Sequence, residues 1–403
     1  MNPSSSGWID KYIFILEKRH KNSLFSNTKL FYNALREVGF IYGFSMRPAV
    51  DLDLKNIELT EEEIGKINLM HALLHNYFQY HQDSSFPEAI DNILLFYAKL
   101  TKDKPSFMRK ISFSTSKTKD VEILLSQRVE KNKTLEKYNF ERIMTQALLF
   151  VDVLSYIYFL KGGKKVDTYI NDLEILILRV CYLALKSKKQ LTSYDLLLNE
   201  LFQASEQYAG KGTKHKITTI ENIDFNLLAT KTEKQYILDL CCLAVWNDLE
   251  IDDAEKQFLN SLTKRLQLPM HSSEESLELL RDFAKNNSAD IHLFHYKHPV
   301  KQFYKQSSKT VKILILRNKN RLLKELSQSK ELLLLLGKST YSDLNPEEKV
   351  KVKDQLLEVC KTIPSLTIFL LPGGSLLLPL LVKFIPQLLP GAFDDNKIPK
   401  KKK

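Results

Sequence analysis

The chain has 403 residues, more than one hydrophobic core usually serves, so two or three domains are expected. Its 59 Lys and Arg residues exceed its 48 Asp and Glu residues by 11, which favours an anionic partner such as phospholipid headgroups or nucleic acid. Four cysteines without ligand-like spacing exclude a disulfide framework and predict buried thiols in a reducing compartment. Asp10 and Glu17 interrupt the apolar residues of the first twenty positions, so we expect no N-terminal export sequence.

Apolar residues recur mostly at helical spacing, and only 12 glycines and 13 prolines interrupt them. The sequence therefore predicts an all-α fold of helical hairpins. Two helices are expected between Thr60 and Leu100, because Thr60 and Glu63 have capping-box spacing and residues 83–87 form a break. These two helices should pair in an antiparallel hairpin.

A Ser, Thr and Lys-rich stretch covers residues 101–119 and favours a linker, which gives an N-terminal helical domain over residues 1–119. A second helical domain is expected over residues 120–290. Its first helices are predicted at Leu135 to Leu160, Thr168 to Lys186 and Leu191 to Tyr208.

A helical hairpin with an acidic turn is predicted between Glu233 and Leu268, its second helix capped by Asp252 with Glu255. The run from Leu243 to Glu255 resembles the helix, acidic turn and helix of TerB-like (tellurite-resistance) domains, over about residues 167–287. The resemblance implies a divalent cation at Asp248, Glu250 and Asp252. The family's turn glycine is Leu249 here, which restricts the positive-φ backbone that gathers carboxylates, so a capped solvent-facing turn is the alternative.

A strongly basic stretch follows, with no acidic residue between Asp290 and Glu325. Phe303, Tyr304 and the apolar run 311–316 are interleaved with it, a pattern compatible with RNA contact, membrane-surface docking or a solvated helix face. The nine positive charges are those of Lys297, Lys301, Lys305, Lys309, Lys312, Arg317, Lys319, Arg321 and Lys324.

The last predicted elements are a capped helix and an apolar segment broken by prolines. Asn345 as cap and Pro346 at the first position predict a helix that runs to about Thr362. Residues 363–382 are then uncharged for twenty positions, just enough to cross hydrocarbon. A kinked span, a re-entrant hairpin and a buried soluble hairpin all remain open, and lysines on both sides favour a hairpin or an interfacial anchor.

This region resembles the core of the LETM family of inner-membrane proteins, over about residues 318–393. The residues that match are Leu344-Asn345-Pro346-Glu347-Glu348-Lys349, Ile363-Pro364, Pro372, Pro379, Lys383, Pro386, Pro390 and Phe393. The resemblance implies a third domain over residues 291–403, made of basic helices and a membrane segment. It also implies cation exchange with protons and ribosome contact.

The candidate membrane segment departs from the family in one chemical respect. Ser375 stands where the family has a glutamate, and coupled ion transport needs a protonatable carboxylate in low dielectric, so transport by this chain is in question. Little of the family's ribosome-binding region follows Phe393, which weakens ribosome contact. The residues assigned to the segment are Pro364, Pro372, Gly373, Gly374, Ser375, Pro379, Lys383, Pro386 and Pro390.

Other candidate sites are less specific. His71 and His75 lie one helical turn apart but lack the acidic position of a zincin, so histidines on an amphipathic helix face are expected there. No nucleophile and base motif appears, so we expect neither an enzyme nor a cofactor.

The first hypothesis is a LETM-like protein at the cytoplasmic face of the inner membrane, with a role in cation homeostasis or envelope maintenance. The second is a cytoplasmic helical scaffold in which residues 376–382 pack on 332–336; the oligomeric state stays open.

Overall fold

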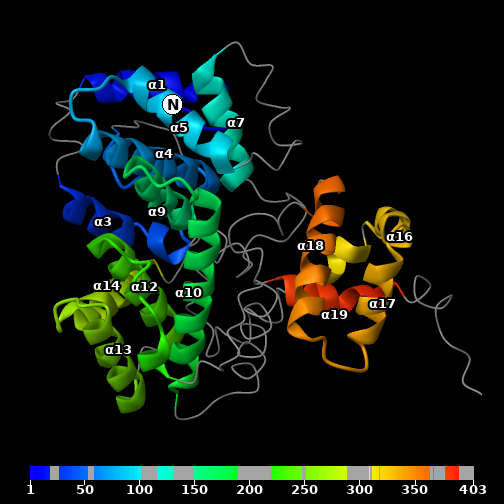
Figure 1. The fold of residues 1–403 in the computed structure, drawn as a ribbon. Coiled ribbons are helices and arrows are strands. Elements are labelled where there is room, and N and C mark those ends of the chain that lie inside the picture. Colours follow the sequence, from blue (N-terminus) through cyan, green and yellow to red (C-terminus); the bar gives the residue numbers. More distant parts are fainter. Residues whose placement is uncertain are drawn as a thin grey trace, which may run out of the picture.

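The computed structural model describes most of the chain. The described residues are 1–18, 27–52, 59–100, 116–129, 149–188, 219–246, 251–287, 308, 311–316, 318–363, 366 and 377–389. Within them the regular elements are α-helices and two short 3-10 turns, which confirms the all-α fold class. The helices form two groups (Figure 1), here called the N-terminal body and the C-terminal unit.

The N-terminal body contains the helices from α1 to α14. Their bounds are α1 Trp8–Glu17, α3 Thr28–Glu37, α4 Glu61–Tyr80, α5 Phe86–Leu100, α7 Lys117–Val129, α9 Leu149–Leu160, α10 Val166–Lys186, α12 Lys231–Val245, α13 Asp253–Arg265 and α14 Ser272–Asn287. The 3-10 turns η1 and η2 are Phe40–Tyr42 and Ile220–Asn222.

Helix α4 is the most deeply buried helix of this body. It begins as predicted with a capping box, in which the Thr60 hydroxyl accepts from the Glu63 amide and the Glu63 carboxylate accepts from the Thr60 amide. It is buried on nearly all sides because α5, α7 and α9 pack around it. Helix α10 in turn packs on α9 and α12, and α12 packs on α14.

The boundary expected at residue 119 falls inside a helix. Helix α7 begins at Lys117 and packs against α1, α4 and α5, all of which come from residues 1–119. Val121, Leu124 and Leu125 are the side chains of α7 that enter this shared core. Helices on both sides of residue 119 therefore share one core, because an amphipathic helix is held by the surface it buries.

The C-terminal unit consists of α16 Lys319–Ser327, α17 Lys330–Lys338, α18 Pro346–Thr362 and α19 Leu378–Leu388 (Figure 1). Helix α18 has the predicted Asn345 cap and the predicted end at Thr362. Helix α17 packs on α16, α18 and α19.

Helix α19 is the described part of the apolar proline-containing segment. Most of its apolar side chains are buried: Leu381 and Ile385 are 0% exposed, like Leu332 and Leu336 of α17, on which α19 packs. Its 11 residues span about 16 Å, roughly half of a hydrocarbon core. Among the described residues, no helix has both the length and the apolarity needed to cross a bilayer.

Candidate functional site

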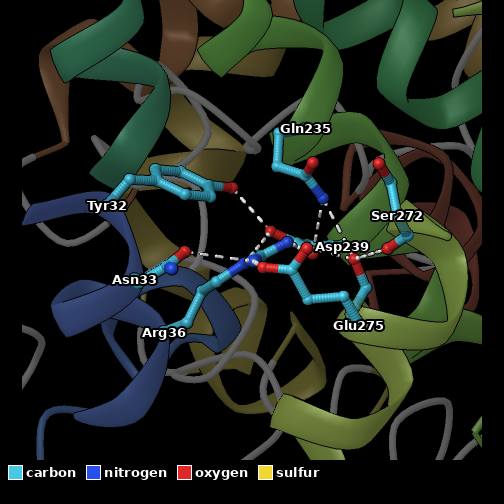
Figure 2. Close-up of polar contacts among 8 residues, drawn as sticks. Tyr32, Asn33, Arg36, Gln235, Asp239, Ser272 and Glu275 are labelled. Carbon is cyan, nitrogen blue, oxygen red and sulfur yellow. Dashed lines mark hydrogen bonds and ion pairs between the residues drawn. The ribbon is translucent and has the colours of Figure 1, made fainter. Parts of the chain in front are cut away.

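A buried polar cluster joins three helices at the centre of the N-terminal body (Figure 2). Asp239 of α12 accepts hydrogen bonds from Arg36 of α3, at 2.8 Å from Nε to Oδ2 and 2.6 Å from Nη2 to Oδ1. The Tyr32 hydroxyl donates to the same Oδ2 at 2.6 Å. Arg36 Nη2 also donates to Ser276 Oγ of α14 at 3.0 Å. We call these four residues the Asp239 cluster.

Helical spacing explains why these side chains meet. Tyr32 and Arg36 are four residues apart on α3, so they project from one face of that helix toward α12. Gln235 lies one turn before Asp239 on α12 and donates to Ser276 Oγ at 3.0 Å. Each helix therefore presents polar groups from the face that it packs against the others.

Burial and the neighbouring carboxylate shift the pKa values of Tyr32 and Arg36. Asp239 is 0% and Arg36 2% exposed. Burial and the neighbouring Asp239 both raise the pKa of Tyr32 well above its ordinary value, so its hydroxyl stays a neutral donor. Burial alone would lower the pKa of Arg36, but Asp239 outweighs it and the pKa is raised, so the guanidinium stays charged. The arrangement suits a permanent clamp between helices rather than proton transfer to a substrate.

A second cluster repeats this geometry in the same body. Asp152 of α9 accepts from Arg128 of α7 through Nε, at 2.7 Å, and through Nη2, and from the Tyr97 hydroxyl of α5 at 3.1 Å. Asp152 is 0% exposed. Sequence reasoning missed both clusters, although a lone aspartate within the apolar runs 149–157 and 236–245 was a visible sign.

The turn proposed as a cation site lies only partly in the described residues. Asp252 is the N-cap of α13, and its Oδ1 accepts from the amides of Ala254 and Glu255 at 2.7 and 3.0 Å. The predicted cap is thus confirmed, while Asp248 and Glu250 lie outside the described residues. No set of three His, Cys, Asp or Glu side chains is placed to hold a metal ion in the described part of the chain.

The histidine pair of α4 lies in the core. His71 and His75 are each 1% exposed. The Tyr12 hydroxyl is 2.6 Å from His71 Nδ1, and the Phe31 ring stacks on the His75 ring at 4.4 Å between centroids. The imidazole of His71 is therefore packed between α1 and α3, and that of His75 against α3.

Four residues of the basic stretch are described, and all four are exposed: Lys312, Lys319, Arg321 and Lys324. Lys312 Nζ lies 4.5 Å from the centroid of the Phe384 ring of α19, and Lys383 Nζ lies 6.0 Å from the same centroid. The structure thus brings Lys312 of the basic stretch against helix α19. Lys297, Lys301, Lys305, Lys309 and Arg317 lie outside the described residues.

Charge is distributed very unevenly along the chain. Residues 291–403 contain 21 basic and 9 acidic residues, whereas residues 1–290 contain 38 basic and 39 acidic residues. Several acids of α17 and α18 already have lysine partners, such as Glu331 with Lys351 at 3.0 Å and Glu348 with Lys338 at 2.7 Å. The whole positive surplus of the protein therefore belongs to residues 291–403.

Three residues assigned to the membrane segment are described, all on α19. Pro379 lies in its first turn, Lys383 is exposed, and Pro386 lies inside the helix. Pro364, Pro372, Gly373, Gly374, Ser375 and Pro390 lie outside the described residues.

In the comparisons with known proteins, no family model, no curated protein and no solved structure matched this chain.

Proposed function

We propose that this chain is a LETM-like, non-enzymatic protein that associates with the cytoplasmic face of the inner membrane. The N-terminal body is a helical platform, and residues 291–403 are the part that meets anionic lipid. The role is cation homeostasis or envelope maintenance. The proposed role does not include ion exchange by this chain itself, because Ser375 replaces the carboxylate that coupled transport of a cation and a proton would need.

The supporting observation is the location of the charge surplus. Residues 291–403 have a net charge of +12 and the preceding residues −1, so attraction to an anionic surface acts on residues 291–403 and not on the N-terminal body. Each Lys or Arg near an anionic bilayer contributes about 1 kcal/mol to binding. The four described residues of the basic stretch are exposed, and one of them, Lys312, lies beside Phe384 of α19.

A second candidate function is a helical scaffold without membrane contact. The burial of Leu381 of α19 beside Leu332 and Leu336 of α17 favours it, because a helix whose apolar side chains are already buried gains little from lipid. In both candidate functions the N-terminal body is a helical platform. The two functions differ in whether the C-terminal unit binds a bilayer.

Flotation of the full-length protein with lipid vesicles separates these functions. We expect binding to vesicles that contain phosphatidylglycerol, weak binding to pure phosphatidylcholine, and release as salt is raised. Replacing Lys319 and Arg321 with glutamine should weaken binding, whereas the exposed lysines of α13, Lys256 and Lys264, provide a matched control pair. Absence of the protein from the floating fraction at low salt would reject the membrane proposal. Binding to RNA or ribosomes instead would identify nucleic acid as the anion.

A further inference from the structure

We infer that the protein docks on an anionic bilayer peripherally, through one face formed by Lys312, Leu316 and Lys383, while α19 stays packed in the C-terminal unit. This inference rests on the proposed membrane association and specifies its surface and mode. It differs from the expectation that the apolar segment itself enters the bilayer.

The helical residues 311–316 are amphipathic in the way such a face requires. Val311 and Ile315 are 0% exposed, whereas Leu316 is 51% exposed. Lys312 and Leu316 are four residues apart, so they lie on the same side of the helical turn, directed to solvent. A large apolar side chain is thus presented next to an ammonium group.

Helix α19 adds the second cation to this face. Lys383 is exposed, and its Nζ lies 6.0 Å from the centroid of the Phe384 ring. Lys312 Nζ lies 4.5 Å from the same centroid. Both ammonium groups therefore lie within about 6 Å of the centre of one ring. The contact of Lys312 with Phe384 exists only while α19 is packed beside residues 311–316, so this face and an inserted α19 are mutually exclusive arrangements.

The chemistry of the face fits a bilayer interface. In interfacial helices an apolar side chain enters the boundary between headgroups and acyl chains, while flanking lysines reach lipid phosphates. The sequence has no acidic residue between Asp290 and Glu325 or between Glu358 and Asp394, the two stretches that supply the face. A phosphate-rich surface is therefore the complementary partner.

The test places an environment-sensitive fluorophore on this face. The native cysteines are all buried, so Leu316→Cys labels selectively at the surface. Leu95→Cys on α5 is a matched control, because Leu95 is 52% exposed in the N-terminal body. With phosphatidylglycerol vesicles we expect a blue shift and brightening for the label at position 316 and no change at position 95. Carbonate should then strip the protein from the vesicles.

A charge variant tests the two lysines of the face. The double variant Lys312→Gln/Lys383→Gln should bind anionic vesicles about 30-fold more weakly, since each charge contributes about fivefold. The control Lys256→Gln/Lys264→Gln should bind as the unaltered protein does.

The outcomes separate this inference from the proposed function. Flotation without a spectral change at position 316 would overturn the docking face and leave membrane association standing. Retention of the protein after carbonate would show that the segment inserts, and would overturn peripheral docking. Failure to float at all would overturn both.

Discussion

Removing one partner of the Asp239 cluster should strongly destabilise the N-terminal body. Asp239→Leu leaves the guanidinium of Arg36, which is 2% exposed, without the carboxylate to which it is hydrogen-bonded and with Glu275 only at 3.9 Å, and it leaves the Tyr32 hydroxyl without its acceptor. Breaking a buried ion pair from one side costs about 3–5 kcal/mol, because the remaining charge stays desolvated. We expect a loss of that size in the free energy of unfolding.

A double-mutant cycle distinguishes a clamp from a merely crowded site. Arg36→Met should cost a similar amount, but the combination Asp239→Leu/Arg36→Met should be more stable than either single variant by about 2 kcal/mol or more, because no buried charge remains. The exposed ion pair of Lys117 with Asp91 is the control, and Lys117→Met should cost about 1 kcal/mol or less.

Urea unfolding followed by tryptophan fluorescence suits this experiment. The only two tryptophans of the sequence, Trp8 and Trp246, are both buried in the N-terminal body, so their emission reports on that body alone. A cost below about 1 kcal/mol for Asp239→Leu, or single costs that simply add in the double variant, would refute the interpretation of the cluster as a clamp.

Three further predictions concern packing and pH. Gly39→Ala should lower the free energy of unfolding by more than 2 kcal/mol, because the φ of +83° at this position is costly for alanine and the added Cβ would lie 2.3 Å from the Phe283 ring. Thermal unfolding measures this loss. The control is Gly7→Ala, because Gly7 also has a positive φ but has open space around it. Leu381→Ala should cost the C-terminal unit about 2–5 kcal/mol, seen as faster hydrogen exchange in α17, whereas Leu334→Ala, at a 60% exposed position, should change little. The tyrosines of both clusters have pKa values raised by burial and by their aspartates, so their contribution to stability is full below about pH 10 and is lost as the pH rises further. Part of the tyrosinate absorbance, that of the buried tyrosines, should therefore appear only together with loss of helical circular dichroism, and full tyrosinate absorbance in the intact fold would contradict the assigned burial.

Helix starts were predictable from the sequence because their cause is local. Thr60 with Glu63 and Asn345 with Glu348 satisfy backbone amides within a single turn, so spacing alone predicts the bond. The end of α18 at Thr362 was predictable as well, because a proline follows two residues later.

The buried clusters could not be predicted in the same way. Arg36 and Asp239 are 203 residues apart, and nothing local indicates which of many arginines will reach a given aspartate. The packing of α7 could not be predicted for the same reason, since α7 is held by surfaces of α1, α4 and α5 that only the folded chain brings together. Local composition describes how polar a stretch is but not what it packs against.

The balance of basic and acidic residues differs between residues 1–290 and residues 291–403, and this difference supports the functional proposal. Residues 1–290 have nearly equal numbers of both signs, and the buried Arg36 and Arg128 are paired with the buried carboxylates of Asp239 and Asp152, so the electrostatic interactions of the N-terminal body can be satisfied internally. Residues 291–403 have more than twice as many basic as acidic residues, so most of their cations have no acid of the same region to pair with. Mutual repulsion of such a surplus opposes compaction unless anions from outside neutralise it. An anionic surface at the C-terminal unit would therefore both bind that unit and stabilise its fold, which predicts that anionic vesicles protect α16 to α19 from hydrogen exchange while leaving the N-terminal body unchanged.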